Sequence, residues 1–259
     1  MALRVGLAAL AAMSLVTVPT NAARPADVVH DTDYTISLAG LPIAKASFHT
    51  KLDDRRYTIS GTLSSAGLAD ILSSTSGRTE VSGTIETDKL VATDYSVRYQ
   101  TGKKKRAIDV AFDNGNVTSA TLTPQRKKPP KNWVPVTKED MRGVVDPLSG
   151  LIFPAGAKVC PKTLPVFDGE SRMDLKLSAK GTKPFKTEGF SGDVIVCGIQ
   201  FVPKSGYRKG REDVDYLRKL DSMEIWFAKS DTVQVYAPVY VRIPTKYGPV
   251  TVWATRFKG

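Results

Sequence analysis

The chain has 259 residues, with 37 Lys or Arg, 26 Asp or Glu, two Cys and two His, which gives a formal net charge of +11. Hydrophobic residues make up 41% and charged residues 24%, ordinary globular values that exclude a collagen-like, coiled-coil or wholly disordered chain. Two cysteines are too few for a small protein held by several disulfides or for a zinc finger built on four cysteines.

Residues 1–22 are predicted to be a secretory signal peptide. A single positive charge, Arg4, precedes an apolar stretch from Val5 to Val18, and small residues occupy the positions before the expected cleavage after Ala22. The stretch is shorter than the roughly 20 residues that a membrane-spanning helix needs, and a buried N-terminal helix is the less favoured alternative. No cysteine follows that could carry a lipid, so we expect a soluble periplasmic protein rather than a lipoprotein.

Residues 23–259 are expected to form a single β-rich domain. Polar and apolar residues alternate with a period of two in most segments, which is typical of strands that bury one face. The predicted strands are Asp33–Leu38, Ile43–Leu52, Tyr57–Leu63, Arg78–Thr87, Val91–Tyr99, Arg106–Phe112, Val117–Leu122, Met173–Ala179, Asp193–Val202, Met223–Ala228, Val233–Ile243 and Val250–Phe257.

Tight turns separate many of these strands, as at Asp113-Asn114-Gly115-Asn116, and this spacing predicts an antiparallel meander. A meander of this length must curl or close, because otherwise it would leave a long exposed edge. We therefore expect a mainly β fold with one large, strongly curved antiparallel sheet. Such a sheet forms an open or incomplete barrel, or a spiral, with a few short helices.

Helical signals are few. Gly67–Leu72 could form a short helix, and Arg208–Leu220 either a surface helix or an irregular excursion. The best candidate is Thr137–Leu151, where Thr137 would cap the first turn and Asp140 follows three residues later, although Pro147 would interrupt it. Helices and strands do not alternate, so a parallel α/β sheet is not expected.

A basic segment near residues 126–131 breaks the pattern. Its two prolines, Pro129 and Pro130, exclude a helix and a central strand. The segment is either a linker between two domains or a long loop on one sheet. The loop is favoured because both halves of the chain have the same strand-rich character.

Export bears on the two cysteines, because disulfides persist in oxidising compartments. We expect Cys160 and Cys197 to form a disulfide, and closing a loop of this length stabilises a fold by about 4 kcal/mol in the loop-entropy model. Two separate buried thiols are the alternative.

The sequence lacks the usual parts of an enzyme. His30 and His49 are the only histidines, no Gly-x-Ser-x-Gly element occurs, and both histidines are expected to be solvent-facing or at a sheet edge. No spacing fits a zinc or calcium site. We therefore predict no catalytic residues, no metal and no cofactor. An unrecognised hydrolase using Asp146, Asp168 or Glu224 stays an alternative.

The positive charge of an exported protein points to anionic envelope material rather than nucleic acid. The charge is concentrated in basic runs, which either protect edges and keep the chain soluble or form an anion-facing rim. If they form a rim, its candidates are Lys127, Lys128, Lys131 and Arg208. For an apolar ligand, the predicted concave face carries Tyr34, Ile36, Phe48, Ile59 and Trp226.

Several short motifs resemble an uncharacterised family of exported proteins of Gram-negative bacteria, domain of unknown function 3108. The motifs are Asp146-Pro147-Leu148-Ser149, Phe167-Asp168-Gly169, Val196-Cys197-Gly198 and Ser205-Gly206-Tyr207, together with the Tyr34–Phe48 hairpin. The resemblance implies an architecture similar to periplasmic open β-barrels and β-spirals, a group that includes lipoprotein carriers and envelope-integrity proteins. It implies no activity.

Asp146 and Asp168 are expected to form turns, because each precedes Pro or Gly and Asp readily caps its own backbone. The expected function is non-enzymatic binding of a hydrophobic or anionic envelope component in support of envelope integrity. The partner would be an envelope lipid or an envelope protein, with peripheral membrane contact. The alternative to a ligand carrier is an interaction module that docks through a strand edge or the basic rim.

Overall fold

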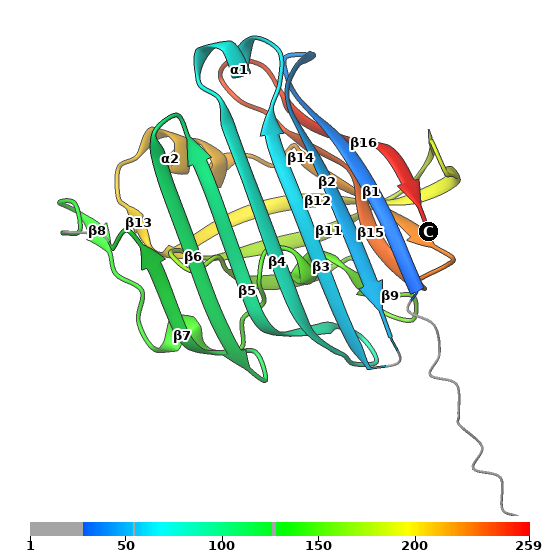
Figure 1. Cartoon of the computed structure of the whole chain (residues 1–259), viewed down its shortest axis with the longest axis horizontal. Coiled ribbons are helices and arrows are strands. Elements are labelled where there is room, and N and C mark those ends of the chain that lie inside the picture. Colours follow the sequence, from blue (N-terminus) through cyan, green and yellow to red (C-terminus); the bar gives the residue numbers. More distant parts are fainter. Residues whose placement is uncertain (1–27, 54, 126–127) are drawn as a thin grey trace, which may run out of the picture.

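Both halves of the chain contribute strands to one antiparallel sheet, which holds fourteen strands in the described residues (28–53, 55–125 and 128–259) of this computed structural model (Figure 1). The predicted signal peptide and Lys127 fall outside these residues and stay predictions. The mainly β fold, with its large antiparallel sheet and few helices, agrees with the expectation from the sequence.

Seven strands of the first half form what we call the N-terminal wall. Each pairs antiparallel with the strand before it, so the wall is a simple meander. The strands are β1 (Val28–Leu38), β2 (Leu41–Leu52), β3 (Arg56–Ser65), β4 (Thr75–Ile85), β5 (Leu90–Thr101), β6 (Lys104–Asp113) and β7 (Asn116–Thr123). Helix α1 (Leu68–Leu72) lies between β3 and β4, where a short helix was predicted.

The second half forms the C-terminal wall. Its strands are β9 (Phe153–Pro154), β10 (Lys162–Phe167), β11 (Arg172–Thr187), β12 (Phe190–Ser205), β14 (Met223–Ser230), β15 (Val235–Ile243) and β16 (Val250–Lys258). A separate pair joins β8 (Trp133–Val134) to β13 (Tyr207–Arg208). The surface helix α2 (Glu212–Lys219) lies inside the predicted segment 208–220.

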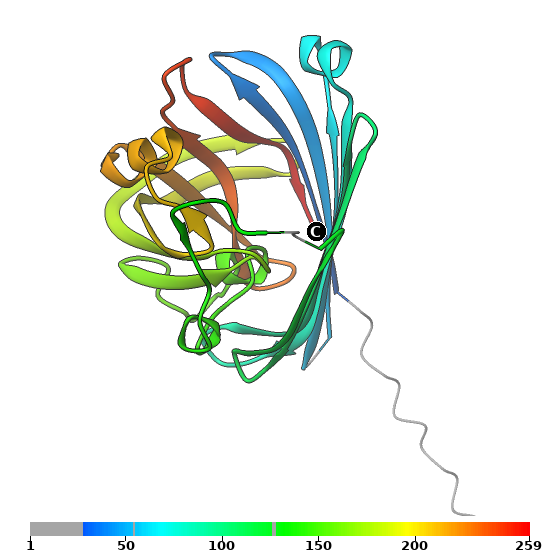
Figure 2. The ribbon, with the colours of Figure 1, turned by 90° about the vertical axis from the view of Figure 1, so that its left-hand side faces the viewer.

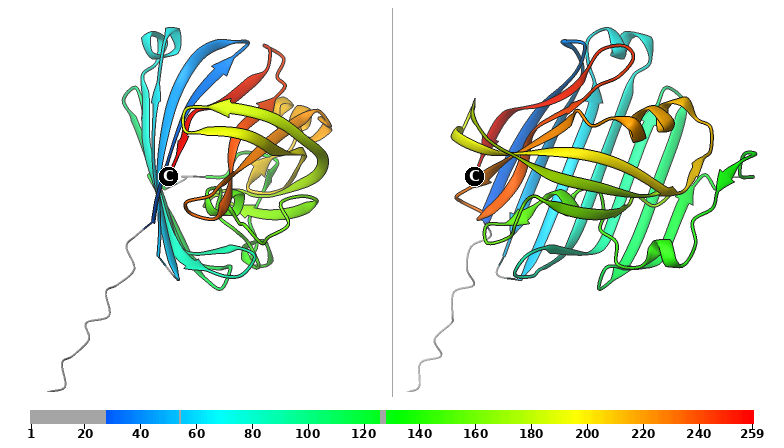
Figure 3. Two further views of the ribbon diagram at one scale, coloured as in Figure 1. Left: turned by 90° about the vertical axis from the view of Figure 1, so that its right-hand side faces the viewer. Right: turned by 180° about the vertical axis from the view of Figure 1, so that it is seen from behind.

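Strands β16 and β1 pair along their length and join the two walls into one sheet. The strand order runs from β10 through β16 and β1 to β7, and within the described residues β7 and β10 do not pair. The sheet is therefore strongly curved but open. Figure 2 shows the two walls facing each other, and the right panel of Figure 3, a view from behind, shows the β11–β12 hairpin crossing in front of the N-terminal wall.

The space between the walls holds most of the apolar core. Inward-facing side chains of the N-terminal wall, such as Tyr57, Ile59 and Val81, share one buried cluster with Val233 and Val235 of the C-terminal wall. The period-two alternation explains this arrangement, because every second residue of each strand points to the same face.

The predicted helix over residues 137–151 is wrong. Only two 3₁₀ turns form there, η1 (Glu139–Met141) and η2 (Ser149–Leu151). The predicted capping contacts do form: the Thr137 hydroxyl accepts from the Asp140 amide at 3.3 Å, and the Thr137 amide donates to Asp140 Oδ2 at 2.9 Å. They start only one turn. Val145 then leaves the helical path, because its amide donates to Pro165 O at 2.9 Å on the edge of β10.

Strand β10 is the longest element that the sequence pattern missed. Pro165 interrupts the run Lys162–Phe167 and made a strand difficult to recognise. The structure accommodates the proline because β10 ends the strand order, and an edge strand tolerates a residue without an amide hydrogen.

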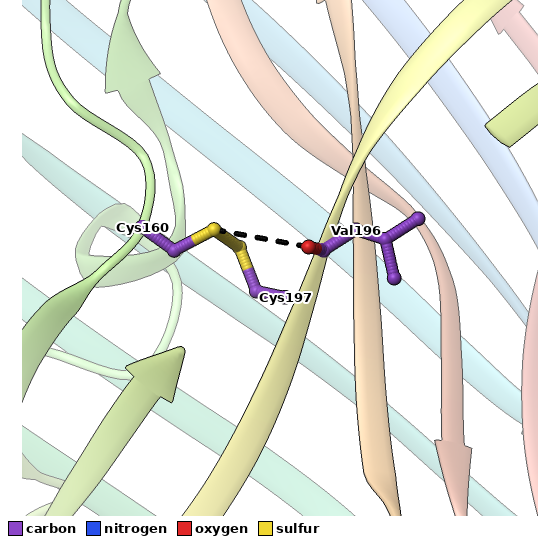
Figure 4. Close-up of a disulfide and its surroundings, with 3 residues drawn as sticks. All are labelled: Cys160, Val196 and Cys197. Atoms are coloured by element: carbon purple, nitrogen blue, oxygen red, sulfur yellow. Dashed lines mark hydrogen bonds between the residues drawn. A yellow bond between two sulfur atoms is a disulfide. The ribbon is translucent and has the colours of Figure 1, made fainter. Parts of the chain in front are cut away.

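The predicted disulfide between Cys160 and Cys197 is present (Figure 4). The two Cα atoms are 6.2 Å apart, within the range that disulfides span. Cys197 lies fully buried in β12, whereas Cys160 lies in the loop that enters β10. The bond therefore ties that loop to the middle of the C-terminal wall.

Candidate functional site

An apolar cavity of about 270 Å³ lies between the two walls. Every second residue of β1 from His30 to Ile36 lines it, so the lined stretch is about 20 Å long at the usual rise per strand residue. The C-terminal wall contributes Val235 and Ala237 of β15. The volume is near the lower end of the range, about 300 to 1,000 Å³, that ligand pockets occupy.

The structure places most of the predicted concave-face residues on this cavity. Tyr34, Ile36, Phe48 and Ile59 all line it, whereas their role in binding stays a prediction. The Tyr34 ring meets the Phe48 ring edge to face at 5.8 Å between centroids. The Tyr34 hydroxyl donates to Pro238 O of β15 at 2.6 Å and so connects the two walls beside the cavity.

The placement of Trp226 on the same inner face is wrong. Trp226 lies instead in an aromatic cluster with Phe185, Tyr240 and Trp253, and the Lys183 ammonium sits 4.7 Å from its ring centroid. The reason is the alternation in β14, where Ile225 and Phe227 face one side and Trp226 the other.

One end of the cavity is polar and buried. His30, Thr32 and Thr50 line it, and each is at most 5% exposed. The expectation that His30 is solvent-facing or at a sheet edge is therefore wrong, since β1 lies between β16 and β2. β1 turns this residue inward opposite Thr50, and the His30 ring packs against Phe257 at 4.3 Å between centroids. His49, by contrast, is 42% exposed and contacts Asp31 at 2.7 Å.

One hydrogen bond ties the ring of His30 to the C-terminal wall. Ser230 Oγ lies 3.1 Å from His30 Nδ1 and accepts from the Val233 amide at 3.4 Å. The serine hydroxyl donates to Nδ1 when the ring carries its hydrogen on Nε2, and it accepts from Nδ1 in the other tautomer. Nε2 has no hydrogen-bond partner in the described residues. Burial lowers the pKa of His30 to about 4, so the ring is neutral at pH 7.

The other end of the cavity is apolar and reaches the surface. Leu63 lines the cavity and is nevertheless 37% exposed. It pairs with Ala46, four residues along β2 from Thr50 at the polar end. The cavity therefore has one enclosed polar end and one open apolar end.

The motif Asp146-Pro147-Leu148-Ser149 serves two purposes. Asp146 Oδ1 accepts from the amides of Leu148 at 2.8 Å and Ser149 at 2.9 Å, and the Ser149 hydroxyl donates to Oδ2. Asp146 is fully buried, and burial raises the pKa of its carboxyl. The turn that it forms brings Pro147 and Leu148 to the cavity wall.

Asp168 forms a second turn of the same kind, between β10 and β11. Its Oδ1 accepts from the amides of Glu170 at 2.8 Å and Ser171 at 2.7 Å, and burial raises its pKa. Gly169 in this turn has φ +94°, and a Cβ there would collide with Ile108 of β6. The turn thus rests on the opposite wall, where the Glu170 carboxylate also accepts from Arg106. Both expected turn roles are observed.

The basic candidates lie elsewhere. Lys128 and Lys131 are exposed in the segment between β7 and β8, and Arg208 is exposed in β13, beside Trp133. None of the three lines the cavity. The structure therefore separates the basic candidates from the apolar candidates that line the cavity.

Glu224, another catalytic alternative, accepts from Trp226 Nε1 at 3.1 Å and pairs with Lys183 at 3.6 Å. Across the part of the chain that the structure describes, no cluster of His, Cys, Asp and Glu could hold a metal ion. No helix among the same residues combines the length and the apolar character needed to cross a membrane.

Sequence reasoning missed the contribution of the C-terminal wall to the cavity. Val235, Ala237 and Val252 line it together with Tyr34 and Ile36. The period-two pattern of β15 and β16 indicates that these residues share a face. It does not indicate which wall they face, because that depends on the pairing of β16 with β1.

A solved structure supports the architecture. The chain is similar to a beta-barrel-like protein of domain of unknown function DUF1849 from Brucella abortus, with 12% identity and a TM-score of 0.54. The match covers 89% of this chain and 97% of that protein, and at this identity it shows the fold alone. No curated protein matches the sequence significantly. The family model described as "Protein of unknown function (DUF3108)" matches residues 33–255. With most of its length matched, the chain belongs to the DUF3108 family.

Proposed function

We propose that this protein binds a hydrophobic envelope component, such as the acyl chain of a lipid, in the cavity between its walls. The observation that supports the proposal most directly is the cavity itself, which is elongated, lined mainly by apolar side chains and open at Leu63. An apolar cavity that stays empty loses contacts on its lining, so a ligand that fills it is stabilised by burial.

The polar end narrows the class of ligand. His30 Nε2 is buried with no hydrogen-bond partner in the described residues, and a buried polar atom without a partner costs about 1 to 3 kcal/mol. A hydroxyl or a protonated carboxyl group can both donate and accept, so it would remove this cost for either tautomer of the ring. The preferred ligand is therefore a chain with one hydroxyl or carboxyl group at its inner end.

We propose binding rather than catalysis. The carboxylates of Asp146 and Asp168 are engaged by backbone amides of their own turns, which is a structural use of the side chain. The periplasmic location and a role in envelope integrity are part of the same proposal. They are supported by the predicted signal peptide and by the disulfide, which suits an oxidising compartment.

Narrowing the cavity tests the proposal. Ala46 and Ala237 line it from opposite walls, so the double variant Ala46→Leu/Ala237→Leu fills part of its volume. We expect weaker binding of a fluorescent long-chain fatty acid to this variant than to the wild type. The matched control is Ala179→Leu, an exposed position on β11, which should bind as the wild type does. Equal binding by all three proteins would place the ligand outside the cavity.

A second candidate function rests on strand β7. Within the described residues, Val117–Thr123 makes backbone hydrogen bonds only to β6, so its outer edge is bare. The other end of the sheet is covered, because Val145 pairs with Val166 on β10. A bare edge can accept a strand from a partner protein. A photo-crosslinking residue in place of Ser119 should then capture an envelope protein in intact cells, whereas one in place of Ser96 should not.

A further inference from the structure

The three most exposed large apolar side chains in the described residues are Leu41, Ile71 and Tyr247, at 64%, 81% and 83%. We call them the apolar rim. Leu41 begins β2, Ile71 lies in α1, and Tyr247 lies in the turn between β15 and β16. Exposure of this extent on three separate connections is not explained by packing within the chain.

These three connections lie side by side at one end of the sheet (Figures 1 and 3). The Ala39 amide donates to Pro249 O at 2.9 Å, which joins the β1–β2 turn to the β15–β16 turn. The Ala66 amide donates to Ile43 O at 2.9 Å, which joins the connection carrying α1 to β2. The apolar rim is therefore one surface, built by residues far apart in the sequence.

The same end is basic. Gly102 donates to Ser74 O at 3.0 Å, so the β5–β6 turn adjoins the connection that carries α1. The turn and the start of β6 expose three consecutive lysines, Lys103, Lys104 and Lys105. Lys246 also lies at this end, but it pairs with Glu212 at 2.9 Å. Asp70 of α1 is exposed beside Ile71, so the net positive charge of this end comes from the lysines of the β5–β6 turn.

The opposite end of the sheet differs in both respects. Its turns and adjoining residues expose five acids, Asp53, Glu86, Asp88, Asp113 and Asp231, and five basic residues, Lys51, Arg55, Arg56, Lys89 and Lys258, so that their charges balance. Its one exposed large apolar side chain in the described residues is Val28, at 36%. Because consecutive strands alternate in direction, the turns of the meander sort into these two ends.

We infer that the apolar rim and the adjoining lysines rest on the surface of an anionic lipid bilayer. Lysines are attracted to the negative charge of such a surface, and exposed apolar side chains can insert into it. Tyrosine is common at the level of the lipid headgroups, which suits Tyr247 in the β15–β16 turn. A bilayer accepts separate protruding side chains without a complementary shape, and it matches the positive charge. The inference goes beyond ligand binding in the cavity, although Leu63 brings the open end of the cavity near this rim.

Sedimentation with vesicles tests the inference on the purified wild-type protein and three variants. The rim variant is Leu41→Ser/Ile71→Ser/Tyr247→Ser, and the lysine variant is Lys103→Gln/Lys104→Gln/Lys105→Gln. The control, Lys51→Gln/Arg55→Gln/Lys89→Gln, also removes three positive charges, but at the opposite end of the sheet. The vesicles contain phosphatidylethanolamine and phosphatidylglycerol, or phosphatidylcholine alone.

We expect the wild type and the control to bind the phosphatidylglycerol vesicles, and the lysine variant to bind them about tenfold or more weakly. The rim variant should lose binding as well, and phosphatidylcholine vesicles should bind less of every protein. Equal losses in the control and the lysine variant would overturn the inference, because binding would then follow net charge alone.

Two further results would also overturn it. One is a wild type that binds neither kind of vesicle. The other is self-association in sedimentation velocity that the rim variant abolishes, which would make the rim a contact between copies of the chain. The cavity variant Ala46→Leu/Ala237→Leu should bind vesicles normally, so failure of the cavity proposal and failure of this one are distinguishable.

Discussion

The two walls of this protein are built on different principles. In the N-terminal wall every strand pairs with the strand before it, through short connections. The strands of the C-terminal wall also pair in chain order from β10 to β16, apart from β9 and β13, but this wall adds distant contacts. They are a disulfide between residues 37 positions apart and the insertion of Val145 beside β10. Local pairing forms early and without cross-links, whereas distant pairing must overcome the entropy of loop closure.

The cavity exists only where the two walls meet. Tyr34 and His30 of the N-terminal wall reach Pro238 and Ser230 of the C-terminal wall on one side. On the other side, Arg106 of β6 pairs with Glu170. Ligand binding should therefore report whether the C-terminal wall is docked, and changes that loosen this wall should reduce binding even far from the cavity.

The largest effect is expected from the disulfide, which belongs to the C-terminal wall alone. Cys197→Ser should lower the free energy of unfolding by about 4 kcal/mol under oxidising conditions, because the loop of the unfolded chain is no longer closed. Urea unfolding measures the change, and the reduced wild type should behave like the variant. An unchanged midpoint, or two free thiols in the wild type by alkylation mass spectrometry, would contradict the account.

A smaller effect is expected at Asp146, whose turn places Pro147 and Leu148 between the walls. Asp146→Ala leaves two buried amide donors without an acceptor and should cost about 3 kcal/mol. Asp146→Asn keeps an oxygen for those amides, so its loss in urea unfolding should be less than half as large. Equal losses would mean that the charge, rather than the turn, is what the fold requires.

The same contrast explains how much could be predicted from the sequence. Strand β3 was predicted as Tyr57–Leu63 and is observed as Arg56–Ser65, because alternation and turn residues are local signals. In the C-terminal wall the alternation of polar and apolar residues did not reveal β10, because Pro165 interrupts the segment Lys162–Phe167. The backbone of Val145, which covers the outer edge of β10, lies about 20 residues away in the sequence.

Some residues of the candidate site could be predicted from the sequence, and others could not. Tyr34, Ile36 and Phe48 were predicted from alternation in β1 and β2, and the structure places them on the cavity. Trp226 and His30 were assigned to the wrong environments. Their surroundings depend on how the C-terminal wall folds over the other wall, and a single strand carries no signal for that.

The third prediction concerns pH and the contact between His30 and Ser230. The pKa of His30 is lowered to about 4 by burial, so below pH 6.5 the unfolded chain takes up a proton that the folded chain excludes. Lowering the pH should therefore lower the free energy of unfolding. Between pH 7 and pH 5, His30 alone should account for a loss of about 2 kcal/mol.

His30→Gln removes this contribution, whereas the other acidic groups still titrate. The difference in stability between the wild type and the variant should shrink by that amount as the pH falls from 7 to 5. Urea unfolding at both pH values measures it. A difference that is constant with pH would show that His30 is not buried in its neutral form.

The smallest effect is expected from the single hydrogen bond of Tyr34. Tyr34→Phe keeps the ring in the cavity lining and removes the donor to Pro238 O, which should cost about 1 kcal/mol. Thermal unfolding monitored by circular dichroism measures it. If the variant is as stable as the wild type, the two walls are held together by apolar packing and by the other polar contacts.

The central claim is that the space between the walls holds a hydrophobic ligand, and native mass spectrometry tests it most directly. The protein would be purified from the periplasm without detergent, in parallel with Ala46→Leu/Ala237→Leu and the control Ala179→Leu. We predict a bound lipid or fatty acid on the wild type and the control, and its loss from the cavity variant. A wild type that is free of ligand, or a ligand that the cavity variant retains in full, would contradict the account.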